Sequence, residues 1–174
     1  FHFFTGFLTF LTIKFVIERS TQNRVLALAG ALIFWLTPGV YNMLSTTYID
    51  VAVAAYTFLS FTVLVLGLEA DNKKLLFLSG CLLGSAACVK YIALYDAVSI
   101  AISWIYIAAT QSKKIGVKNI FIFFAGFLAF ASYWLIRNYL LTQNPFYPYW
   151  GFLFGLEQRS SATYYSGSGL GKSV

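Results

Sequence analysis

The chain has 174 residues, of which 59% are hydrophobic, 20% are aromatic and only 10% are charged. A soluble domain of this length carries about 25% charged residues, because its surface must be solvated. The composition therefore excludes an ordinary soluble domain and indicates a multi-pass protein whose surface faces lipid. A net charge of +6 favours nucleic-acid binding in a soluble protein, but the positions of the cations explain it better here. We expect no nucleic-acid partner.

The first residues are Phe1-His2-Phe3-Phe4, so the chain begins inside an apolar run without an initiator Met. Removal of a signal peptide leaves a polar start to the mature protein. We therefore expect this sequence to be part of a longer protein whose N-terminal segments precede Phe1.

Six apolar stretches follow one another, and a helix needs about 20 such residues to cross a bilayer. The stretches are 1–17, 25–43, 51–68, 75–90, 91–109 and 119–141. Pro38 and Gly39 lie inside the second stretch and should kink or end its helix. The break between the fourth and fifth stretches, at Lys90-Tyr91, has no turn residues. The sequence thus predicts an all-α polytopic helical bundle with about six transmembrane helices.

The last 33 residues differ in character from the rest, so we divide the chain into a transmembrane bundle (1–141) and an interfacial loop region (142–174). Pro145 and Pro148 exclude a regular helix between them. The neighbouring Tyr and Trp side chains favour the membrane interface. Residues 160–171 are rich in Ser, Gly and Tyr, which is typical of a flexible loop.

Most Lys and Arg residues lie in every second loop, and the loops of a membrane protein that are richer in Lys and Arg are cytoplasmic. The larger cluster consists of Lys14, Arg19, Arg24, Lys73, Lys74, Lys113, Lys114 and Lys118. The smaller one consists of Lys90, Arg137, Arg159 and Lys172. We predict a plasma (inner) membrane protein with cytoplasmic loops at 18–24, 69–74 and 111–118. Region 142–174 is then extracytoplasmic, on the same side as Asp50, Lys90 and Arg137.

Four charged residues near this outer side need a physical reason. Asp50 is interpreted as the N-cap of the third helix, a role compatible with facing a cavity. Lys90 has no charged neighbour within five residues, and a Lys in the bilayer costs about 2.5–3.5 kcal/mol or more. It either binds an anion, snorkels to the interface or forms a structural pair. Asp96 lies six residues further on, on a different face from Lys90, and a partner outside the chain is one interpretation of it that stays open.

Arg137, next to Asn138, is either an interfacial anchor or a phosphate ligand, because its guanidinium presents a planar fork of donors. Other patterns in the sequence give weaker indications of a functional site. His2 has no partner histidine for a metal, and Gly167–Ser173 departs from the spacing of a phosphate-binding loop. Cys81 and Cys88 are too far apart on one helix for a disulfide. Gly80 and Gly84 with their small neighbours indicate close helix packing.

Three motifs resemble the polyprenyl-phosphate-dependent membrane glycosyltransferases of the GT-C superfamily, such as protein O-mannosyltransferases and aminoarabinose transferases. They are Pro38-Gly39 followed by Ser45 and Tyr48-Ile49-Asp50-Val51-Ala52; Gly80 to Tyr91, a glycine-spaced helix ending in Lys90; and Trp134 to Tyr139 with Thr142 to Pro148. Gly169 to Ser173 is similar to a further loop of relatives. The motifs cover residues 30–174, and their order carries the resemblance rather than any one of them.

The resemblance implies an enzyme that moves a sugar from a polyprenyl-phosphate carrier to an acceptor on the outer face of the membrane. Asp50 would be the second acidic residue of its catalytic cavity. Lys90 and Arg137, with Tyr91 and Asn138 beside them, would bind the carrier phosphate. The family's principal catalytic carboxylate would precede Phe1. No cofactor is expected beyond the lipid-linked sugar donor, and dependence on a divalent metal stays open.

The chemistry is consistent with these residue types, because an acceptor hydroxyl needs a general base and a leaving phosphate needs nearby cations. The expected partners are the lipid bilayer, the lipid-linked donor and an acceptor, with further membrane-complex partners open. The alternative is a non-catalytic multi-pass subunit of a membrane complex, or part of a transporter. A transporter should show repeat symmetry and polar groups near the bilayer midplane. A structural subunit should bury its helix faces against neighbours.

Overall fold

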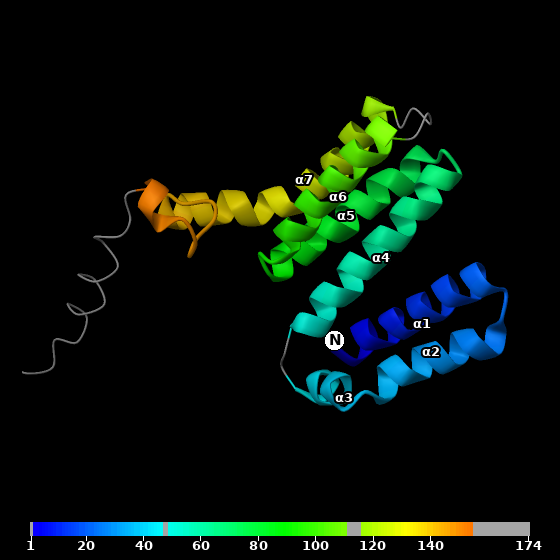
Figure 1. Cartoon of the computed structure of the whole chain (residues 1–174). Coiled ribbons are helices and arrows are strands. Elements are labelled where there is room, and N and C mark those ends of the chain that lie inside the picture. Colours follow the sequence, from blue (N-terminus) through cyan, green and yellow to red (C-terminus); the bar gives the residue numbers. More distant parts are fainter. Residues whose placement is uncertain (1, 47–48, 111–115, 155–174) are drawn as a thin grey trace, which may run out of the picture. The chain divides into compact units, whose positions relative to one another are not determined.

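The computed structural model describes residues 2–46, 49–110 and 116–154, which form helices and turns without a strand (Figure 1). The helices are α1 (His2–Thr21), α2 (Arg24–Leu36), α3 (Pro38–Ser45), α4 (Asp50–Glu69), α5 (Lys73–Val89), α6 (Ala93–Thr110), α7 (Val117–Thr142) and the short 3-10 helix η1 (Gly151–Phe154). The predicted all-α class is confirmed for this part of the chain.

Two of these helices, α4 and α7, are long and apolar enough to cross a membrane. Helices α2 and α3 pass the same test together, as one span bent by 61°. Between Ala93 and Trp104, α6 is a shorter apolar helix. The apolar helices therefore support a membrane-embedded protein with two or three spans among the described residues. The count of six stays a prediction.

The bend between α2 and α3 lies at Pro38, as the sequence predicted. The ring of a proline disfavours helical geometry in the residue before it, and Thr37 is accordingly extended, with φ −61° and ψ 121°. Pro38 then occupies the first turn of α3, where its missing N–H leaves no hydrogen bond unmade. One apolar stretch thus becomes two helices.

The first compact unit, Phe1–Ala131, is built around α4, which packs side by side with α5 and also contacts α1 (Figure 1). Two fully buried serines join α4 to α5: Ser60 Oγ donates to Ser79 O at 2.8 Å, and Ser79 Oγ donates to Ser60 O at 2.7 Å. Helices in lipid gain little from the hydrophobic effect, so such bonds help hold them together.

Helices α5 and α7 approach each other at glycines, which confirms the predicted role of Gly80 and Gly84. A Cβ atom at Gly80 would lie only 1.9 Å from Phe123 O, and one at Gly84 would lie 2.4 Å from Phe127 O. From the α7 side, a Cβ at Gly126 would lie 2.2 Å from Phe77 O. The two backbones touch because no side chain stands between them.

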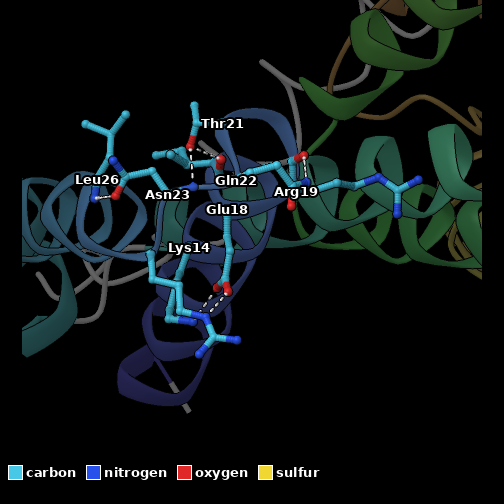
Figure 2. Close-up of polar contacts among 9 residues, drawn as sticks. Lys14, Glu18, Arg19, Thr21, Gln22, Asn23 and Leu26 are labelled. Atoms are coloured by element: carbon cyan, nitrogen blue, oxygen red, sulfur yellow. Dashed lines mark hydrogen bonds and ion pairs between the residues drawn. The ribbon is translucent and has the colours of Figure 1, made fainter.

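Tight turns with asparagine caps make antiparallel hairpins of α1 with α2 and of α4 with α5. Asn23 Oδ1 accepts from Leu26 N at 3.0 Å to cap α2, and Figure 2 shows this contact in the α1–α2 turn. Asn72 Oδ1 likewise accepts from Lys74 N at 3.0 Å to cap α5. These caps satisfy backbone N–H groups that a helix start leaves without partners.

The second unit begins at Ser132, within α7, and is described by itself. After α7 ends at Thr142, the chain forms turns and then η1, as its prolines predicted. Asn144 is fully buried and organises the turns: its Nδ2 donates to Tyr149 O at 2.7 Å, and its Oδ1 accepts from Phe146 N at 2.9 Å. The loop expected at 160–171 and the Gly169–Ser173 motif lie outside the described residues, as do Lys113 and Lys114.

Candidate functional site

The structure brings Asp50 and Lys90 together as an ion pair, with Lys90 Nζ donating to Asp50 Oδ1 at 2.5 Å. Asp50 is the first residue of α4, and Ile49 is the N-cap, without a side-chain cap bond. The interpretation of Asp50 as the N-cap is therefore wrong by one position, because its backbone is already helical. Its carboxylate still lies in the first turn, where the helix dipole stabilises a negative charge.

Lys90 follows the last residue of α5 as its C-cap and has an extended backbone. Its N–H donates to Ala86 O at 3.0 Å, which closes the helix. The side chains of Lys90 and Asp50 are 45% and 42% exposed. A pair so accessible gains only about 0–1 kcal/mol from its attraction, so stability alone gives little reason for placing these charges there.

A second ion pair lies at the other end of α4, where Arg19 donates to Glu69. A 20-residue helix is about 30 Å long, which matches the thickness of the hydrocarbon core. The predicted loops 18–24 and 69–74 thus share one end of the unit, and Asp50 and Lys90 share the other. The two groups of segments thus lie at opposite ends of α4, and which end faces the cytoplasm stays a prediction.

A second set of charges surrounds Glu18 near the end of α1, where the chain turns into α2 (Figure 2). Lys14 Nζ donates to Glu18 at 2.9 Å and Arg24 Nε donates at 3.0 Å. The hydrogen bond from Lys14, helped by Arg24, lowers the pKa of Glu18 from its ordinary value. The carboxylate at this turn stays ionised and tied to its neighbours.

A groove of about 550 Å³ runs between α4 and α6 and has Asp50 in its lining. Its polar lining residues are Asp50, Thr57, Asp96, Ser99 and Ser103, and its apolar ones are Val53, Ala54, Phe58, Phe61, Ile92 and Ile100. Pockets that bind small molecules have this character, mostly apolar with a few placed polar groups.

Asp96 is the site residue whose environment the sequence analysis missed. Thr57 Oγ1 donates to Asp96 Oδ2 at 3.2 Å, so Asp96 has a partner within the chain, and pairing with a group outside it stays a prediction. One signal was present in the sequence: Asp96, Ser99 and Ser103 recur at i, i+3 and i+7, which places them on one face of an otherwise apolar helix. The sequence pattern did not indicate that Thr57 of α4 faces Asp96.

The remaining predicted site residues lie in different surroundings. Tyr91 follows Lys90 in the turn before α6, where its carbonyl accepts from Leu94 N at 2.9 Å. Arg137 belongs to the second unit, with its guanidinium 5.0 Å from the centre of the Trp134 ring. Asn138 is buried there, with Nδ2 3.5 Å from Pro145 O. Among the predicted site residues, the structure therefore pairs Asp50 with Lys90.

Within the described ranges, no group of three or more His, Cys, Asp or Glu side chains is placed to hold a metal ion. Cys81 and Cys88 are free thiols, in agreement with their spacing. In comparisons with known proteins, no protein-family profile, curated protein or solved structure matches the chain.

Proposed function

We propose that this chain is part of a membrane glycosyltransferase that moves a sugar from a polyprenyl-phosphate carrier to an acceptor hydroxyl on the extracytoplasmic face. The observation that carries the proposal is the Asp50–Lys90 pair, a carboxylate and an ammonium 2.5 Å apart at one end of α4. Asp50 also lines a groove large enough for a small molecule. Both groups are half exposed, so substrates can reach them.

In the proposed reaction Asp50 acts as general base and removes the proton of the acceptor hydroxyl as its oxygen attacks the anomeric carbon. The bond from that carbon to the carrier phosphate breaks, and the phosphate leaves with the bonding electrons. Lys90 stabilises the negative charge that develops on this phosphate. Tyr91, next to Lys90, is proposed as a further contact of the carrier phosphate, and phosphate binding by Arg137 and Asn138 stays a prediction from the sequence.

The ion pair has a consequence for the order of events. An ammonium has three N–H donors, so Lys90 can keep one bond to Asp50 while it meets a phosphate. The phosphate competes for Lys90 and thereby frees part of the Asp50 carboxylate for the acceptor proton. Arrival of the carrier would thus prepare the base. At the membrane boundary, the prenyl chain stays in lipid while the sugar meets water.

The test uses the full-length protein in proteoliposomes and measures sugar transfer from labelled polyprenyl-phosphate donors. Asp50→Asn and Lys90→Gln should each lower the transfer rate about 100-fold or more, the range expected for loss of an acid–base group or of charge stabilisation. The matched controls are Glu69→Gln and Arg19→Gln, which remove the equivalent pair at the other end of α4. The controls should keep nearly full activity.

A charge swap separates catalysis from a structural role. In Asp50→Lys combined with Lys90→Asp the ion pair can re-form, so the protein should fold and insert normally. Transfer should stay abolished, because the base and the phosphate ligand have exchanged places. Recovery of activity in the swap, or full activity of Asp50→Asn, would remove Asp50 from the site and favour the non-catalytic subunit.

A further inference from the structure

A second carboxylate lies deeper in the α4–α6 groove than Asp50. Thr57, the hydrogen-bond partner of Asp96, follows Asp50 by seven residues, which is about 10 Å along the helix. The groove therefore carries charge from its end at Asp50 to a level well inside the apolar part of α4. A carboxylate at such a depth is costly unless it is paired or bound.

Asp96 has acceptor capacity that the described residues do not fill. A carboxylate offers about four lone-pair sites, and the described residues provide one hydrogen bond, from Thr57. Asp96 also lies in the first turn of α6, where the helix dipole stabilises it slightly. That effect does not supply donors for the remaining lone pairs, which border a groove of about 550 Å³.

The other polar groups of the groove wall are acceptors as well, because their protons are already used. Ser99 Oγ donates to Tyr95 O and Ser103 Oγ donates to Ser99 O, each at 2.8 Å, and Thr57 donates to Asp96. The complementary ligand must therefore bring several hydrogen-bond donors. The apolar side chains between these groups, Phe58 and Phe61 among them, suit the C–H faces of a ring.

We propose that the α4–α6 groove binds a sugar ring whose hydroxyls donate to Asp96, Ser99 and Ser103. This inference rests on the proposed function and makes Asp96 a binding residue, distinct from the base Asp50. A polyhydroxylated ring supplies many donors and apolar faces together. The ring belongs either to the lipid-linked donor or to a carbohydrate acceptor.

The test measures how fast a hydrophilic thiol reagent labels Ser99→Cys in the full-length protein, on a background without other cysteines. Val98→Cys is the matched control, because Val98 is 57% exposed on the same helix and is not among the groove residues. Ser99→Cys should be labelled from the Asp50 side, and protection is then measured with polyprenyl phosphates carrying hexoses or pentoses, with bare polyprenyl phosphate and with free mono- and disaccharides.

At least one glycosylated carrier should slow labelling of Ser99→Cys about fivefold or more, without slowing labelling of Val98→Cys. Adding Asp96→Asn should raise the half-protecting concentration about tenfold or more, as expected for loss of a charge-assisted hydrogen bond. Thr57→Val removes only the hydrogen bond to Asp96, so it should raise the half-protecting concentration less. Asp71→Asn should leave this concentration unchanged. Protection by free saccharides alone would assign the groove to the acceptor.

Equal protection by bare polyprenyl phosphate would show that the groove holds the prenyl chain, and protection by sodium ions would show a cation site. Either result overturns the inference, as does protection by no sugar or an absence of labelling. Loss of transfer in Asp50→Asn without sugar protection refutes this inference alone. Active Asp50→Asn with sugar protection intact refutes the proposed base but not the sugar groove.

Discussion

Adding one methyl group at Gly80 should push apart helices α5 and α7. In the native structure the α5 and α7 backbones touch there, and a Cβ at Gly80 would lie 1.9 Å from Phe123 O and 2.8 Å from Phe127 N. Both obstacles are backbone atoms of a helix, which cannot rotate away as a side chain can. The Gly80→Ala variant must therefore move a whole helix.

The size of the movement follows from the geometry. Real Cβ atoms essentially never approach other atoms within 3.0 Å, so α5 and α7 must separate by at least 1.1 Å, the difference between 3.0 Å and 1.9 Å. Overpacking of this kind costs about 1–3 kcal/mol, and we expect the upper part of that range. The smaller overlaps of Gly126→Ala at 2.2 Å and Gly84→Ala at 2.4 Å should cost progressively less.

The assay is unfolding of the purified full-length protein in mixed detergent micelles, compared between wild type and each variant. Gly39→Ala is the control, because nothing lies within 4 Å of a Cβ at this helical glycine, and Ala is the better helix former by up to about 1 kcal/mol. Gly39→Ala should match or exceed wild-type stability. A Gly80→Ala variant as stable as Gly39→Ala, or a reversed order of the three glycines, would refute the close α5–α7 contact.

Three further outcomes are expected. Thr46→Cys and Asp71→Cys should be labelled by a membrane-impermeant reagent from opposite sides, because they lie at opposite ends of α4; labelling from one side would contradict the topology. Asn144→Ala should remove the side-chain hydrogen bonds to Phe146 N and Tyr149 O, at about 1–3 kcal/mol, and faster hydrogen exchange across 146–150 would reveal it. The lowered pKa of Glu18 contributes stability that is present above its ordinary value of 4.5 and is lost as pH falls through the folded-state value. Glu18→Gln should flatten the acid limb of a pH–stability profile, and an unchanged limb would refute the Lys14–Glu18–Arg24 contacts.

Features that depend on near neighbours in the chain were predictable. Pro38 ended a helix because its ring acts on the residue directly before it, and the glycines at 80 and 84 indicated a contact face because they recur at helical spacing. The asparagine caps were overlooked, although Asn23 and Asn72 stand directly before helices. Asp50 was predicted to be the N-cap of its helix but is the first helical residue, because the ends of helices are uncertain by a residue or two.

The sequence by itself determined that the described part of this chain is helical and suited to lipid, and where its main breaks fall, because composition and local spacing decide these properties. Only the tertiary structure decided which polar side chains of different helices meet. Asp50 with Lys90, Thr57 with Asp96, and Arg19 with Glu69 are 39 to 50 residues apart. Helix α4 is apolar along most of its length, so no polar stripe indicates which of its faces turns toward α5 or α6. The rotation of each helix about its axis comes from packing, through contacts such as Ser60 with Ser79 and Gly80 with Phe123, and that rotation places the carboxylates in one groove.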